Sequence, residues 1–107
     1  MPKKHHSVYV IELSPGVMYD KKFQQENWGF LRSLPCYYVG MTGHSPEVRF
    51  AHHKVHYKSS RIAYKYGVRL VPELYEKYNP MTYKEAVKKE IELTDELKKL
   101  GHGVWSR

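Results

Sequence analysis

Short runs of apolar residues with the composition of β-strands occur at three places along the chain. Residues 8–13 and 36–42 are rich in β-branched and aromatic side chains, and residues 68–71 have the same composition over a shorter run. A Ser-Pro-Gly turn signal ends the first run. Residues 17–35 show no clean periodicity, so we interpret them as a long ordered loop or partial helix between two paired strands.

The other segments have the end signals and the period of helices. A Ser-Pro-Glu sequence at residues 45–47 predicts a helix start, and this helix is expected to run to about residue 59. A short second helix over residues 60–66 is closed by a glycine. Residues 82–100 begin with a capping box and continue as an apolar stripe, which predicts a long amphipathic helix.

These elements combine into one small α+β domain. We predict a three-stranded, mainly antiparallel sheet flanked by helices. The chain has 107 residues, enough for one modest hydrophobic core, so residues 1–107 are expected to form a single domain.

The chain carries an excess of basic residues. Its 18 Lys and Arg against 11 Asp and Glu give a formal net charge of +7. This charge favours a polyanionic partner, with nucleic acid as the first choice and an anionic membrane surface as the second. A soluble basic protein without such a partner is the alternative.

The N-terminal run and the cysteine content indicate the compartment. Cys36 is the only cysteine, which excludes an intrachain disulfide and gives no sign of an oxidising compartment. The apolar run after His6 is interrupted at Glu12, too early for a signal peptide or a membrane span. We therefore expect a cytoplasmic protein without a membrane partner, and the sequence indicates no obligate protein partner.

Two tyrosines on the predicted strands are candidates for chemistry. If the first two strands pair, Tyr9 and Tyr38 can lie close together. Strand tyrosines more often serve packing, and that alternative stays open. Gly40 lies inside the second strand, where it leaves a bare patch of backbone that a phosphodiester can approach closely.

The first predicted helix supplies positive charge. Arg49 and His53 are four residues apart and share one helical face, whose alternative role is a solvated polar side. The opposite, buried face is expected to hold Val48, Ala51 and Val55. Basic residues suited to contacts with nucleic-acid phosphates continue along the helix and beyond it, at Lys54, Lys58, Arg61 and Lys65.

Glu90 is the carboxylate candidate for holding a metal ion. It lies four residues after Ala86 on the predicted helix 82–100. A glutamate on a Lys-rich helix is more often a surface charge that pairs with a lysine one turn away, and this alternative stays open. Its combination with the other candidates is what favours a functional site.

In their order and spacing these residues resemble the GIY-YIG nuclease family. The two motif triplets read Ser7-Val8-Tyr9 and Tyr38-Val39-Gly40 here, and they are followed by Thr42, Arg49, His53, Ala86 and Glu90. The likeness extends from residue 7 to about residue 104 and fits a small, single-domain prokaryotic or phage-type member. The chain departs from the family pattern in having Ser7 for glycine, Met41 where many members have Lys or Gln, a longer segment between the motif strands, and no clear asparagine after Glu90.

The resemblance implies a compact sheet flanked by helices, with the site residues converging on one groove. It implies a metal-dependent endonuclease that hydrolyses nucleic-acid phosphodiester bonds, and we expect DNA as the substrate. Glu90 would hold one Mg²⁺ or Mn²⁺, and Arg49 would stabilise the transition state. Tyr9 or Tyr38 would act as general base. His53 would hydrogen-bond the attacking water, a motif tyrosine or a phosphate oxygen.

Two other functions are compatible with the same pattern. One is a catalytically inactive nucleic-acid-binding module on the same scaffold. The other is an interaction domain whose basic patch is incidental.

Residues 17–35 are expected to tune the choice of substrate. The segment offers groups for phosphate contacts and base stacking, namely Lys21, Lys22, Trp28, Phe30 and Arg32. The alternative is a structural flap in which Trp28 and Phe30 cover the edge of the core.

Overall fold

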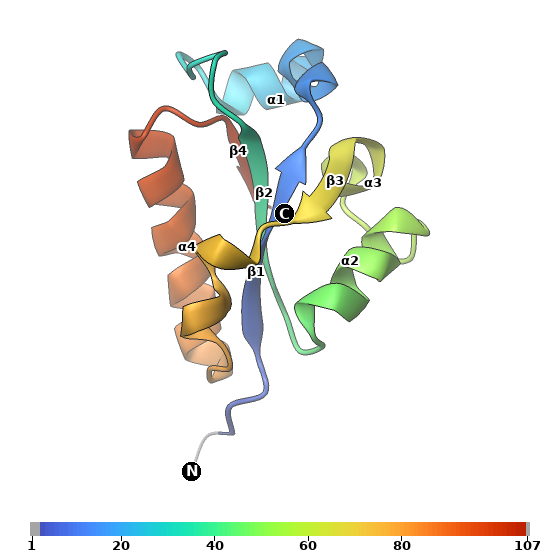
Figure 1. The fold of residues 1–107 in the computed structure, drawn as a ribbon, viewed down its shortest axis with the longest axis vertical. Helices are drawn as coiled ribbons and strands as arrows, with labels where there is room; N and C mark the ends of the chain where they lie inside the picture. The colour runs from blue at the N-terminus through green and yellow to red at the C-terminus, as the bar shows by residue number, and fades with distance from the viewer. Residues whose placement is uncertain (1–2, 107) are drawn as a thin grey trace.

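A four-stranded mixed sheet forms the centre of the molecule. A computed structural model describes residues 3–106, and its strands are β1 (Ser7–Leu13), β2 (Cys36–Thr42), β3 (Gly67–Leu70) and β4 (Val104–Ser106). The strand order is β3-β1-β2-β4 (Figure 1). β1 pairs antiparallel with β2 and β3, whereas β4 runs parallel to β2. The predicted α+β class is confirmed.

The prediction of a three-stranded, mainly antiparallel sheet is wrong in the number and in the direction of the strands. The additional strand, β4, has only three residues, too few to show a period in the sequence. Its parallel pairing with β2 requires a long crossover, which the helices between the two strands provide.

Helices cover both sides of the sheet. In the described part of the chain they are α1 (Lys21–Glu26), α2 (Pro46–Lys54), α3 (Arg61–Tyr66) and α4 (Tyr83–Lys99), with 3-10 turns η1 (Pro15–Tyr19), η2 (Pro72–Leu74) and η3 (Glu76–Tyr78). Figure 1 shows α4 on one side of the strands and α2 with α3 on the other. None of the described helices is long and apolar enough to cross a membrane.

The two helices that carry site residues begin at the predicted caps. At α4, the Thr82 hydroxyl accepts the N–H of Glu85, and the Glu85 carboxylate accepts the N–H of Thr82. At α2, the Ser45 hydroxyl accepts the N–H of Val48 at 3.2 Å. Both caps satisfy amide groups that have no partner within the helix.

α2 differs from its prediction in its end and in its buried face. It ends at Lys54 and not near residue 59, because His56 and Lys58 adopt left-handed φ angles of 62° and 47°. Its one fully buried side chain is His53, at 0 % exposure. The predicted buried face is instead exposed at Val48, Ala51 and Val55.

Strand β1 is the centre of the hydrophobic core. Its residues Val8, Tyr9, Val10 and Ile11 are each at most 1 % exposed. Successive side chains of a strand point to opposite faces, so both faces of β1 are covered. Any group that β1 contributes to a site is therefore held rigidly from both sides.

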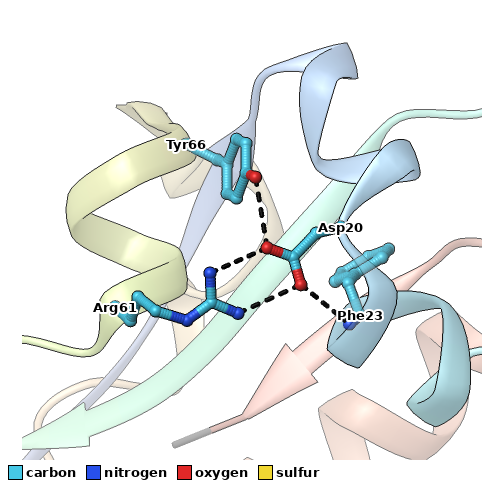
Figure 2. A network of polar contacts seen from close by, with 4 residues as sticks. All are labelled: Asp20, Phe23, Arg61 and Tyr66. Carbon is cyan, nitrogen blue, oxygen red and sulfur yellow. Dashed lines mark hydrogen bonds and ion pairs between the residues drawn. The ribbon is translucent and has the colours of Figure 1, made fainter.

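Asp20 joins the segment before α1 to α3. Its carboxylate accepts two hydrogen bonds from the Arg61 guanidinium, at 2.8 and 3.0 Å, and one from the Tyr66 hydroxyl at 3.1 Å (Figure 2). It also accepts the N–H of Phe23 and so caps α1. These contacts, led by the Arg61 hydrogen bond, hold the pKa of Asp20 well below its usual range. Arg61, predicted to contact nucleic acid, is thus engaged in an ion pair.

We expect Asp20→Ala to lower the free energy of unfolding by about 2 kcal/mol at neutral pH, because it removes a helix cap and the partner of Arg61. The pKa of Asp20 is lower in the folded than in the unfolded state, so its stabilisation is complete above about pH 4 and is lost as the pH falls further. Urea denaturation of wild type and variant, at neutral pH and at about pH 3, measures their free energies of unfolding. The difference between the two free energies should be smaller at the lower pH.

Asp95→Ala is the matched control, because Asp95 is an exposed carboxylate on α4. Its free energy of unfolding should stay within about 0.5 kcal/mol of wild type. An equally small effect of Asp20→Ala would show that the Asp20 contacts contribute nothing to stability.

Candidate active site

Four of the five predicted catalytic residues line one cavity of about 280 Å³. The lining residues come from β1, β2, α2 and α4 and are Tyr9, Tyr38, Gly40, Met41, Arg49, Tyr83, Val87 and Glu90. The register of β1 and β2 sets Tyr9 opposite Gly40, and the Tyr9 and Tyr38 ring centroids lie 6.1 Å apart. The two motif strands thus bring both phenols to the same place.

The cavity lies where β2 becomes an edge strand. β4 pairs with β2 over Tyr37, Tyr38 and Val39. In the described part of the chain, no strand continues beside Gly40 and Met41 on that side. α4 passes this edge and contributes Glu90 to the wall of the cavity.

A larger cavity, of about 460 Å³, lies beside η2 and η3. Its lining combines Pro46, Pro72 and Tyr75 with the carboxylates of Glu47 and Glu76. The predicted catalytic residues do not line it, and its carboxylates disfavour a phosphate ligand.

His53 lies behind Tyr9 and has a defined proton arrangement. The N–H of Ser60 donates to Nδ1 of His53 at 3.2 Å, so Nδ1 carries no proton. Nε2 therefore carries the proton and donates it to the Tyr9 hydroxyl oxygen at 2.9 Å. Burial, together with Arg49 and His52, lowers the pKa of His53 to about 4. At neutral pH His53 is an uncharged donor that positions Tyr9.

Tyr9 fills the space beside Gly40. A Cβ atom at position 40 would lie 2.5 Å from the Tyr9 hydroxyl oxygen, so only glycine fits there. The sequence had suggested that Gly40 leaves room for a phosphodiester, but the phenol of Tyr9 occupies this space. Burial raises the pKa of Tyr9 far above its usual range, Tyr38 adds to this effect, and Arg49 opposes it.

Tyr38 has a different electrostatic environment from Tyr9. Burial raises the pKa of Tyr38 above its usual value, and Tyr9 and the charge of Arg49 oppose this rise only in part. The interaction with Tyr38 raises the pKa of Tyr9, so Tyr9 keeps its proton more firmly than Tyr38 does. Tyr38 therefore ionises more readily than Tyr9.

Arg49 is fixed by the loop that follows α2. Its guanidinium donates to the carbonyl of Lys58 at 2.8 Å and to that of Tyr57 at 3.4 Å. The left-handed residues His56 and Lys58 turn the chain so that these carbonyls face Arg49. Because carbonyls are neutral acceptors, they orient the guanidinium without cancelling its charge.

Glu90 is buried in the wall of the cavity, with 7 % of its surface exposed. The negative charge of Glu90 raises the pKa of Tyr38. This is consistent with the position of both side chains in the lining of the same cavity. Among residues 3–106, no group of three or more His, Cys, Asp or Glu gathers to form a protein-only metal site. Mg²⁺ and similar hard ions, however, bind through one or two carboxylates and take the remaining oxygens from water and phosphate. A single buried carboxylate in the wall of a cavity that two tyrosines also line fits this mode.

The basic residues predicted to contact nucleic acid have different surroundings. Lys54 donates to the carbonyls of Tyr64 and Gly67, at 3.0 and 2.8 Å, and so links α2 to the end of α3. Lys58 and Lys65 are exposed, and each amine lies over the ring of a neighbouring tyrosine. These two side chains can swing to a phosphate at little cost.

Sequence reasoning missed the residues that orient the site. Tyr57 and Lys58 act through their carbonyls, and the bond from Ser60 to His53 comes from its backbone amide, so the side-chain types give no signal for these contacts. Asn79 was also missed: its side chain bonds both the N–H and the carbonyl of Val8, next to Tyr9. In the sequence, an Asn before a proline indicates only a break in the chain.

Comparisons of the chain with family models, with curated proteins and with solved structures find no match.

We expect Gly40→Ala to lower the free energy of unfolding by about 1–3 kcal/mol, because the new methyl group overlaps the buried Tyr9 phenol. Chemical denaturation measures the change. Gly43→Ala is the matched control, since the nearest atom there lies 3.5 Å away, an ordinary contact. Equal stability of both variants would mean that Tyr9 is not packed against position 40.

Proposed function

We propose that the protein is a metal-dependent endonuclease of GIY-YIG type that hydrolyses nucleic-acid phosphodiester bonds, with DNA as the expected substrate. The observation that carries this proposal is the gathering of Tyr9, Tyr38, Arg49 and Glu90 from separate elements in one cavity. Phosphodiester hydrolysis needs a base for the attacking water, positive charge beside the phosphate and a ligand for a divalent ion. These side chains supply all three.

We assign the role of general base to Tyr38. Tyr9 receives a hydrogen bond from His53, and of the two phenols it is the one whose pKa is raised further, so Tyr38 is the phenol that loses its proton more readily. Tyr38 first loses its proton to solvent. The water oxygen then attacks phosphorus, its proton passes to the Tyr38 phenolate, and the bond from phosphorus to the leaving sugar oxygen breaks as that oxygen takes a proton from solvent. Tyr9 and His53 position Tyr38 and do not exchange protons with the substrate.

Arg49 and Glu90 supply the charges that this reaction requires. The guanidinium of Arg49 is already fixed by backbone carbonyls, so it stabilises the negative charge on phosphate without reorganisation. Glu90 would hold one Mg²⁺ or Mn²⁺, which neutralises charge on the leaving oxygen. The exposed Lys58 and Lys65 are suited to contacts with flanking phosphates.

The test of the proposal is cleavage of supercoiled plasmid and of labelled single-stranded and branched DNA, with and without Mn²⁺. We expect Glu90→Gln to abolish cleavage while DNA affinity stays within a few-fold, because the variant loses the ion ligand and keeps the basic surface. Glu96→Gln, which makes the same change at an exposed position on α4, should cleave like wild type.

Full activity of Glu90→Gln would contradict the assignment of this carboxylate. A wild-type protein that binds DNA but cleaves none of these substrates would favour the non-catalytic binding module.

The two tyrosines should respond differently to loss of the hydroxyl group. Tyr38→Phe removes the base, so we expect the single-turnover rate to fall by roughly 10²–10⁴-fold and to lose its increase with pH. Tyr9→Phe removes only a positioning hydrogen bond, so we expect a loss of about ten-fold with the pH dependence retained. The reverse order of effects would make Tyr9 the base.

A further inference from the structure

Trp28 is the most exposed large apolar side chain in the described part of the chain, at 95 %. It lies in the turn that follows α1, and Gly29, with a φ of 84°, reverses the chain after it. Single exposed apolar residues are common on proteins and need no ligand to explain them. The surroundings of Trp28 are what distinguish it.

The loop that carries Trp28 is firmly anchored. The buried side chain of Asn27 donates to the carbonyl of Phe23 at 3.0 Å and accepts the N–H of Val104 at 2.7 Å. The N–H of Leu31 donates to the carbonyl of Gly101 at 2.8 Å. Trp28 is therefore exposed on a rigid loop, and placing a ligand against its indole would cost little conformational entropy.

A cavity of about 420 Å³ lies against the indole. Its lining residues are Gln24, Asn27, Trp28, Gly29, Phe30 and Arg32, and they include no carboxylate. The Arg32 guanidinium lies 5.6 Å from the centre of the Phe30 ring. Phe30 itself packs edge-on against buried Phe23, at 5.9 Å. Phe30 therefore covers the edge of the core, as expected if residues 17–35 form a structural flap. Trp28 does not cover the core.

We propose that this cavity, the Trp28 pocket, binds an unpaired base of single-stranded nucleic acid. A flat, exposed indole offers a stacking surface, the amide oxygen of Gln24 can accept a hydrogen bond from the edge of a base, and the Arg32 guanidinium can bind the adjoining phosphate. The formal net charge of +7 complements a polyanion. A base within a duplex already has both faces covered, so the pocket selects the single strand.

The Trp28 pocket is separate from the candidate active site. A smaller cavity that is also lined by Trp28 reaches Lys98 and Gly101, at the C-terminal end of α4. Lys98 lies eight residues after Glu90, or about 12 Å along the helix axis. Figure 1 shows the loop after α1 and the end of α4 at the same end of the molecule. Base binding there does not depend on cleavage at Glu90.

Tryptophan fluorescence tests this proposal directly. The chain has two tryptophans, and the second, Trp105, is half-buried and stacked on Phe23. Titration with an oligothymidine of about twelve nucleotides should quench the fluorescence of the wild-type protein, and Trp28→Phe should show little quenching. Trp28→Ala should weaken binding of the oligomer roughly ten-fold, as expected for one lost stacking contact.

The matched control variant is Tyr19→Ala, which removes an exposed aromatic ring in the same segment but outside the pocket. Its affinity for the oligomer should equal that of wild type. Trp28→Ala should change the affinity for an abasic oligomer of equal length, or for a duplex, by less than about two-fold.

Three results would overturn the proposal: no quenching by oligothymidine, an equal loss of affinity in Tyr19→Ala, or an equal effect of Trp28→Ala on the abasic oligomer. Self-association of wild type that disappears in Trp28→Ala would assign the surface to a second copy of the chain instead. The same titrations on the Glu90→Gln protein should give the same quenching, so failure of cleavage and failure of base binding are separate outcomes.

Discussion

The hydrogen bond from the Ser60 amide to Nδ1 of His53 sets the direction of every later hydrogen bond in the cavity. It places the imidazole proton on Nε2, so the Tyr9 hydroxyl oxygen accepts from His53 and its own proton stays available to a further acceptor. The same loop presents the carbonyls of Tyr57 and Lys58 to Arg49. One short segment of backbone therefore fixes the orientation of both the phenols and the guanidinium.

This arrangement is constrained by burial. A buried polar group without a partner costs free energy, and a partly satisfied network is worse than an apolar core. His53 is fully buried and has partners at both ring nitrogens, while Tyr9 and Glu90 lie at the cavity wall. The left-handed turn after α2 supplies the backbone groups that this network needs, which gives a physical reason for the end of the helix at Lys54.

Local signals in the sequence were enough to predict β1, β2 and the starts of α2 and α4. They were not enough for β4, whose three residues depend on an edge of β2 that forms only in the folded chain. The order of the motif residues indicated which side chains belong together, because the cavity collects Tyr9, Tyr38, Arg49 and Glu90. The order of the motif residues could not distinguish the roles of Tyr9 and Tyr38. Those roles depend on a backbone amide, that of Ser60, which is far from both tyrosines in the sequence. The ion pair of Arg61 with Asp20 was hidden for the same reason, as the partners are 41 residues apart.

The tautomer of His53 is the most direct test of this account, because the roles of Tyr9 and Tyr38 follow from it. Nitrogen NMR of the imidazole, assigned with His53→Gln, reports which nitrogen carries the proton at neutral pH. The account predicts a neutral ring protonated at Nε2, which gains its second proton only near pH 4. A ring protonated at Nδ1, or one already charged at neutral pH, would contradict it.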